Sequence, residues 1–111
     1  MPTQSKNMRR ASLRCPVPRE IQEVLERDPW MKTCLLADET CEGRLNWQHS
    51  FTYAGRRISE LYFLLPLCES HHRRQASFRR EQEDAIRERI THFKAESDFR
   101  EKYSRSKLLT P

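Results

Sequence analysis

Three cysteines and a histidine stand in two short segments of the chain, on either side of a stretch with strand-like patterning. Six residues separate Cys34 from Cys41, and two separate Cys68 from His71. Thiolate sulfur and imidazole nitrogen are the ligands of closed, tetrahedral structural zinc sites, which draw their ligands from two such segments. The spacing therefore predicts one structural zinc ion held by Cys34, Cys41, Cys68 and His71.

Two other interpretations of the cysteines stay open. Free cysteine is commonly a small buried apolar residue, so these thiols could simply belong to the core. In an oxidising compartment the chain's four cysteines could instead form two disulfides. No apolar run follows the basic N-terminal residues as in a secretory signal, so we expect a cytoplasmic protein with reduced thiols. Cys15 lies apart from both pairs, and we expect it to take no part in the site.

Two more histidines, His49 and His72, are candidates for catalysis rather than for the zinc site. His72 directly follows the assigned zinc ligand His71 and must therefore point elsewhere, toward the strand predicted to carry His49. Two imidazoles that face one another across a strand–strand–helix unit can hold a divalent cation and activate a water molecule. The alternative for His49 alone is a half-buried histidine beside Trp47, without a chemical role.

Two strands and the helix after them must position these groups. Leu45, Trp47 and His49 alternate with polar residues, and this period of two predicts a strand. The apolar run 61–67 predicts a second strand that ends at Pro66, with a turn or loop between the strands. From about Glu69 onward the pattern is helical.

The whole chain is expected to form one small α+β domain, with a two-stranded antiparallel hairpin plus a helix, flanked by further helices. Hydrophobic residues make up 36% of the sequence and charged residues 33%, so a chain this short and polar needs a staple such as a metal. The predicted parts are a basic flexible tail at 1–14, an N-terminal helix at 15–33, a core at 34–80 and C-terminal helices at 81–111.

The run from Cys34 to Arg74 resembles the HNH endonucleases, which have a ββα-metal fold with a flanking zinc knuckle. The segments that carry this resemblance are CLLADETC, WQHS and PLCESHHRR. The resemblance implies a metal-dependent enzyme that hydrolyses DNA phosphodiester bonds, by nicking or cutting with little sequence specificity. By that resemblance His49 is the general base that deprotonates water, and His72 is a ligand of a catalytic Mg²⁺ or Mn²⁺ ion.

Two positions depart from the family pattern. Gln48 stands where the family usually has an acidic or histidine metal ligand, so it would be a neutral, weaker ligand of the divalent ion. Phe63 stands where an asparagine usually orients the general base. The candidates to replace that asparagine are Asn46, Ser59 and a backbone carbonyl, and Glu60 and His92 are candidate replacement metal ligands. These departures keep open a second function, a zinc-stapled DNA-binding module with a degenerate active site.

The charge of the chain favours an anionic partner. The net charge is +5 and the pI about 9.3, and such a balance is most often found in proteins that bind nucleic acid. Arginines flank the histidine segment and occupy the inter-strand loop, where guanidinium groups would contact DNA phosphates without reading bases. The predicted contacts are Arg56, Arg57, Arg73, Arg74, Arg79 and Arg80.

The arginines and the C-terminal helices each have an alternative interpretation that does not involve DNA. The arginines could form a solvated helix face, and the C-terminal helices could instead be the contact surface of a protein-interaction domain. The longest apolar run, Leu61–Cys68, is far too short to span a membrane, so we expect no membrane partner.

Overall fold

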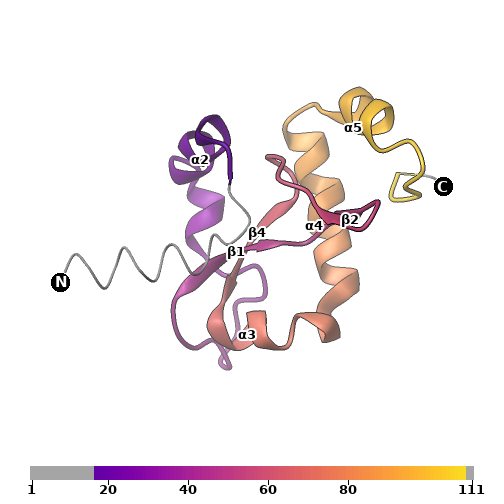
Figure 1. Cartoon of the computed structure of the whole chain (residues 1–111). Helices are drawn as coiled ribbons and strands as arrows, with labels where there is room; N and C mark the ends of the chain where they lie inside the picture. The colour runs from indigo at the N-terminus through magenta and orange to yellow at the C-terminus, as the bar shows by residue number, and fades with distance from the viewer. Residues whose placement is uncertain (1–16, 110–111) are drawn as a thin grey trace.

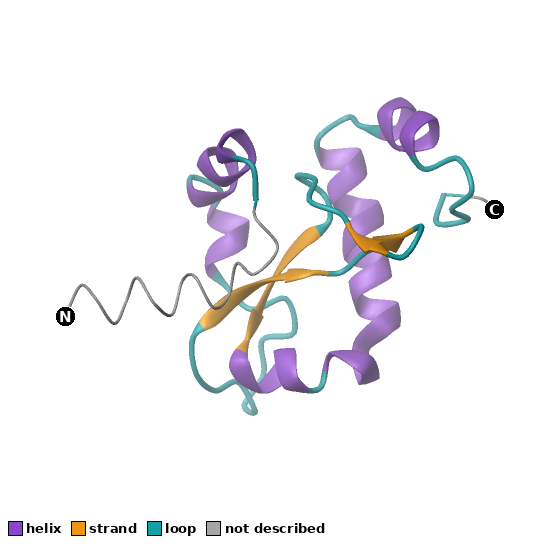
Figure 2. Ribbon diagram, in the orientation of Figure 1, coloured by secondary structure: helices purple, strands orange, loops and turns teal. Residues whose placement is uncertain are grey.

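The computed structural model describes residues 17–109, so the predicted basic tail at 1–14 and Cys15 lie outside the described part of the chain. It confirms the coarse α+β class, with a two-stranded antiparallel sheet surrounded by helices (Figures 1 and 2). In chain order the elements are α2 (Arg19–Glu26), the 3₁₀ helix η1 (Pro29–Lys32), β1 (Leu45–His49), β2 (Thr52–Tyr53), β3 (Arg56–Arg57), β4 (Leu64–Cys68), α3 (Glu69–Arg73), the 3₁₀ helix η2 (Gln75–Phe78), α4 (Arg79–His92) and α5 (Glu96–Lys102).

The central sheet pairs β1 with β4 in antiparallel register, from Leu45 opposite Cys68 to His49 opposite Leu64. The expectation that Pro66 ends the second strand is wrong, because Pro66 lies inside β4, opposite Trp47. In a two-stranded sheet both strands are edges, and proline is tolerated on an edge. The Pro66 carbonyl still accepts a hydrogen bond from the backbone N–H of Leu35, at 2.8 Å.

The turn or loop expected between the two long strands belongs to a small hairpin, in which a tight turn joins two short strands. Thr52 and Tyr53 of β2 pair with Arg57 and Arg56 of β3. The turn between them places Ala54 at φ 54° and Gly55 at φ 78°, and two positive φ values in succession are typical of the tight turns that match strand twist.

The two faces of the central sheet pack against different parts of the chain. Successive strand residues point to opposite faces. Leu64 accordingly packs with Val17, Leu25 and Met31 beside α2, whereas Leu65 packs with a cluster that includes Ile86 of α4. Figure 1 shows the strands lying between α2 on one side and α4 on the other. The sheet is therefore held from both sides, which fixes the positions of the residues at its ends.

Phe63, at the position where the HNH pattern has an asparagine, belongs to the aromatic core. Phe63 is fully buried, and its ring stacks on that of Phe51 with centroids 4.1 Å apart. Phe99 of α5 and Tyr103, which follows it, complete this cluster. None of the described helices is long and apolar enough to cross a membrane.

Candidate metal centre and adjacent histidines

The structure brings together the four residues predicted to bind zinc. Ligand atoms of Cys34, Cys41, Cys68 and His71 all lie within 4.8 Å of one another. The Nδ1 atom of His71 is 3.4 Å from Sγ of Cys34, 3.6 Å from Sγ of Cys41 and 3.1 Å from Sγ of Cys68. A zinc ion at ordinary bond lengths keeps its tetrahedral ligand atoms roughly 3.5–3.8 Å apart. The four side chains therefore have the composition and nearly the spacing of a closed tetrahedral site.

The junction between β4 and α3 positions two of the four residues of this Cys3His cluster, Cys68 and His71. Cys68 is the last residue of β4 and the N-cap of α3, and its sulfur accepts the backbone N–H of His71 at 3.5 Å. Strand end and helix start thus place the two ligands side by side. Cys34 is tied to the same point, because its sulfur accepts the backbone N–H of Cys68 at 3.4 Å.

The loop that carries Cys41 closes against α3 at a glycine. Gly43 has φ +83°, and a Cβ atom there would lie 2.0 Å from Oε1 and 2.7 Å from Cβ of Glu69. Next to it, the carbonyl of Glu42 accepts the backbone N–H of Ser70 at 3.2 Å. Only glycine combines this conformation with so close an approach, and the approach brings Cys41 to the other ligands.

Asp38 and Thr40 support the cluster from outside, and sequence analysis missed both. The second ring nitrogen of His71, Nε2, is 3.5 Å from Oδ1 of Asp38 and 3.3 Å from Oγ1 of Thr40. Thr40 in turn donates its N–H and its hydroxyl to the same Asp38 oxygen, at 2.8 and 2.6 Å. A carboxylate at the far nitrogen of a metal-binding histidine fixes the tautomer that leaves the near nitrogen free for the metal. The pattern Asp-x-Thr between two ligand cysteines was the available signal, since it is typical of an Asx turn.

The cysteine thiols differ in their readiness to ionise. Burial acts to raise the pKa of the Cys68 thiol, but backbone N–H groups of His71 and Glu42 donate to the sulfur and lower it to about 6. Burial raises the pKa of the Cys34 thiol. One thiolate therefore forms readily near neutral pH, whereas the buried Cys34 requires a compensating cation to ionise, as metal coordination provides.

His49 lies half-buried at the end of β1, and among residues 17–109 its ring has one well-defined hydrogen-bond partner. Its Nε2 atom is 3.0 Å from Oγ of Ser59, one of the residues considered for the role of the missing asparagine. Burial, followed by the positive charge of Arg57, lowers the pKa of His49. The imidazole is therefore neutral at physiological pH, which is the form that can accept a proton.

His72 is a half-buried residue of α3, the helix that contacts both β1 and β4. Its Nδ1 atom is buried and has no hydrogen-bond partner within residues 17–109. Buried polar atoms are almost always paired, because an unmade hydrogen bond leaves the desolvation cost uncompensated. The His72 ring is thus not committed to an internal contact through this nitrogen.

Gln48 belongs to a buried amide network rather than to an evident metal site. Its side-chain amide donates to Oε1 of Gln75 and to its neighbour's carbonyl, and the amide of Gln82 donates to the Gln75 carbonyl at 2.9 Å. The hydroxyl of Ser50 completes the network by donating to Gln82 at 2.7 Å. Because neighbouring strand residues face opposite ways, Gln48 and His49 leave β1 on different faces.

The other two candidate metal ligands are held elsewhere. Glu60 accepts the Tyr103 hydroxyl at 2.6 Å and pairs with Lys102 at 3.3 Å, and His92 packs its ring on Phe93. Within residues 17–109 the Cys3His cluster is the only set of three or more Cys, His, Asp or Glu ligand atoms close enough to hold a metal ion.

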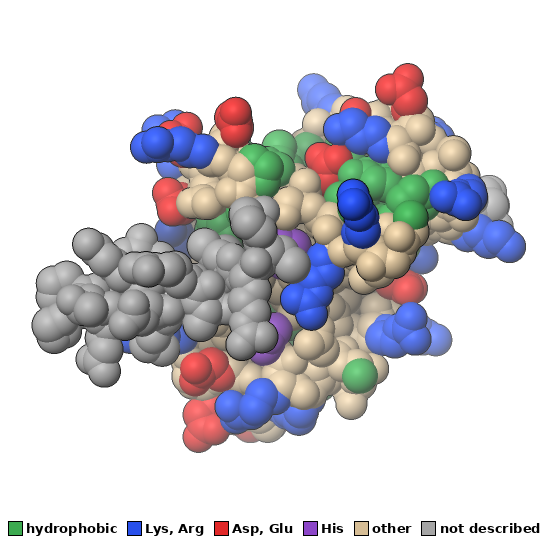
Figure 3. Space-filling model, in the orientation of Figure 1, with side chains coloured by type: hydrophobic (Ala, Val, Ile, Leu, Met, Phe, Trp, Pro, Cys, Tyr) green, Lys and Arg blue, Asp and Glu red, His purple; other side chains and the backbone are tan. Residues whose placement is uncertain are grey.

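All six arginines predicted to contact phosphate are exposed, but one of them already has a role in the loop. Arg74 donates to Oγ1 of Thr40 at 3.1 Å and to Oγ of Ser70 at 2.9 Å, and its guanidinium lies over the Phe78 ring. Arg74 therefore braces the segment between the two cysteines of the loop. On the face shown in Figure 3, histidine side chains appear in two places with Lys or Arg atoms between them.

The candidate site thus has two parts. The Cys3His cluster has suitable ligands, near-tetrahedral spacing and a carboxylate behind its histidine. Beside it along the chain, α3 carries His72, and the partner strand of β4 carries His49. No protein-family model, curated protein or solved structure matches this chain.

Proposed function

We propose that this chain is a metal-dependent endonuclease of the HNH type, with a zinc-stapled ββα core that hydrolyses DNA phosphodiester bonds. One observation carries the proposal. β1 ends in His49, its partner strand β4 ends in the cluster residue Cys68, and α3 then carries His71 and His72 in succession. Two of the four cluster ligands, Cys68 and His71, and both His49 and His72 thus come from the same two strands and one helix, which supports the proposal.

Zinc in the Cys3His cluster would act as a structural ion. A closed site with four protein ligands leaves no open position for a substrate, so it stabilises the fold rather than taking part in the reaction. It would fix the start of α3, and with it the backbone of His72.

His49 would serve as the general base. If Nε2 carries the proton and donates to Ser59, the lone pair of the ring lies on Nδ1, which can accept a proton from water. The pKa of His49, lowered by burial and by Arg57, keeps this lone pair free at neutral pH. Ser59 would hold the ring orientation, as the family's asparagine is expected to do.

His72 would hold the catalytic divalent ion, Mn²⁺ or Mg²⁺. Such an ion polarises the phosphate and stabilises the negative charge on the leaving oxygen. Nδ1 of His72 has no hydrogen-bond partner within residues 17–109, and this supports a ring that is available to a ligand. The exposed arginines on β3, α3 and α4 would position the DNA through its phosphates.

The test is to incubate supercoiled plasmid with the purified, zinc-loaded protein, with and without Mn²⁺. The proposal requires nicked or linear plasmid only when the divalent ion is added. If intact plasmid is recovered over the full range of Mn²⁺ and Mg²⁺ concentrations, the proposal is wrong.

A second candidate, a zinc-stapled DNA-binding module without activity, is favoured by two residues. Gln48 is occupied in the amide network and Phe63 in the aromatic core, so neither takes the usual family role. This candidate predicts DNA binding that weakens steeply with salt, without any cleavage.

A further inference from the structure

Two adjoining pockets open beyond the end of β1, and neither is lined by a cluster ligand, His49 or His72. The first, of about 380 Å³, lies between the β2–β3 hairpin and the segment after α5, residues 105–108, which we call the C-terminal segment. The second, of about 460 Å³, lies between the same hairpin segment, α4 and the C-terminal segment. Both pockets are lined by Phe51, Thr52 and Ser106, so they adjoin one another.

The second pocket, which we call the cationic pocket, has the lining of an anion site. Arg79, Arg87 and Lys107 contribute positive charge to its wall, against a single acid, Glu83. Arg87 is engaged with Asp84 and with the Leu108 carbonyl, and so holds the C-terminal segment in place. Arg79 and Lys107 are exposed. The Ser50 hydroxyl donates to Gln82, but the hydroxyls of Thr52 and Ser106 on the same wall are donors that suit phosphate oxygens.

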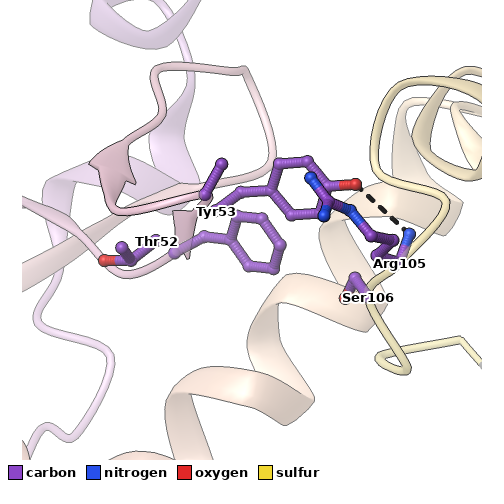
Figure 4. A pocket seen from close by; sticks show the side chains of 6 residues that line it. Thr52, Tyr53, Arg105 and Ser106 are labelled. Atoms are coloured by element: carbon purple, nitrogen blue, oxygen red, sulfur yellow. Dashed lines mark hydrogen bonds between the residues drawn. The ribbon is translucent and has the colours of Figure 1, made fainter.

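The first pocket, which we call the aromatic pocket, combines a ring with a guanidinium. Arg105 lies over the ring of Tyr53, with Cζ 5.7 Å from the ring centre (Figure 4). The backbone N–H of Arg105 also donates to the Tyr53 hydroxyl at 3.2 Å, which fastens the two walls of the pocket together. Aromatic rings and guanidinium planes are the surfaces on which nucleobases stack.

We propose that the two pockets together form a subsite for one unpaired nucleotide, with its base against Tyr53 and Arg105 and its phosphate in the cationic pocket. An aromatic surface next to a cationic one is typical of sites that bind single strands, and the faces of a base inside a duplex are covered by its neighbours. The subsite begins at Ser50, one residue after His49. The proposal rests on the proposed function in its ligand class, DNA, but not on catalysis.

The experiment measures binding of a short, labelled single-stranded oligonucleotide and of the duplex with the same sequence, by fluorescence anisotropy without added Mn²⁺ or Mg²⁺. Tyr53→Leu should weaken binding of the single strand about tenfold, since a stacked base contributes on this scale. Binding of the duplex should change less than about twofold, because its bases do not reach the ring. Tyr53→Phe, which keeps the ring, should restore most of the single-strand affinity.

The cationic pocket is tested by Lys107→Ala with Lys32→Ala as the matched control, because Lys32 is exposed and lines neither pocket. Lys107→Ala should reduce the slope of log affinity against log salt by about 0.7 for the single strand. Lys32→Ala should leave that slope unchanged. Deoxythymidine monophosphate should compete for the subsite more strongly than inorganic phosphate, because only the nucleotide fills both pockets.

Several results would overturn the subsite. They are unchanged single-strand binding by Tyr53→Leu, an equal loss for single strand and duplex, and inorganic phosphate competing as well as the nucleotide. The failure of the subsite is distinct from the failure of the nuclease. If only the subsite is wrong, the Tyr53 and Lys107 variants bind single strands normally while plasmid cleavage persists. If only the nuclease is wrong, cleavage is absent while single-strand binding still depends on Tyr53.

Discussion

The Cys3His cluster differs from His49 and His72 in how many contacts hold the side chains in place. In the cluster, the sulfurs of Cys34 and Cys68 accept backbone hydrogen bonds, and the far nitrogen of His71 lies beside Asp38. His49 has one partner in Ser59, whereas Nδ1 of His72 has none within residues 17–109. A structural metal requires its ligands to be fixed in advance, whereas a reaction site must leave groups free for water and substrate. The contrast is consistent with the folding role proposed for the cluster and the chemical role proposed for His49 and His72.

The largest expected effect is the loss of a cluster ligand. Cys68→Ser should abolish zinc binding and remove the cooperative thermal unfolding transition, because structural zinc contributes roughly 10–16 kcal/mol of apparent binding free energy in small domains. Elemental analysis and circular dichroism measure the two effects. Cys15→Ser is the matched control and should retain zinc and the transition. Equal zinc content in both variants would remove Cys68 from the site.

The second-largest expected effect is the loss of stability caused by Gly43→Ala. The added Cβ meets the backbone-proximal part of Glu69 and is strained at φ +83°, so we expect a loss of about 1–3 kcal/mol in the free energy of unfolding. Gly55→Ala is the control, because Gly55 also has positive φ, 78°, but open space around its Cβ position. Urea denaturation should show a clearly larger loss for Gly43→Ala. Equal losses would mean that the close contact with α3 contributes nothing.

Asp38→Ala should weaken the cluster without unfolding the domain. Removing the carboxylate behind His71 frees the ring to rotate, and we expect the affinity for zinc to fall about tenfold. Competition with a chromogenic chelator measures this change. Glu39→Ala, a neighbouring exposed acid, should leave the zinc affinity as it is. A fall of the same size for Glu39→Ala would indicate a general effect of charge.

The smallest predicted effect is a shift in the pH dependence of cleavage. The acid limb of the rate at saturating DNA should follow the pKa of His49, which burial and Arg57 hold below its ordinary value of 6.5. Activity should rise as pH increases through that pKa, because the base is active when neutral. Arg57→Gln removes the positive neighbour, so the pKa should rise and the acid limb should move to higher pH. A limb that stays in place or moves to lower pH would contradict the assignment.

How much could be predicted from the sequence depended on whether a residue's role follows from chemistry and spacing or from tertiary contacts. The four cluster ligands were found because Cys68 and His71 have knuckle spacing and two further cysteines, Cys34 and Cys41, precede the first strand, although their spacing is looser. Asp38 was missed because an exposed carboxylate in a loop has no periodicity. The role of Gln48 could not be predicted, because it depends on Gln75 and Gln82, 27 and 34 residues further along the chain.

The strand boundaries also depend on tertiary contacts that the sequence pattern does not reveal. The local preference of Pro66 predicts a strand end, but the pairing with β1 and the hydrogen bond from Leu35 override that preference. The turn within YAGRR was expected, but β2 and β3 beside it were not, because strands of two residues are too short to show a period of two.

The central claim, that His49 performs chemistry while the cluster only supports it, is tested most directly by plasmid cleavage with Mn²⁺ in paired histidine variants. His49→Ala should abolish nicking and keep one zinc per chain, while His92→Ala, at an exposed histidine packed on Phe93, should cleave like the unmodified protein. Cleavage by His49→Ala at the unmodified rate, with zinc still bound, would contradict the account.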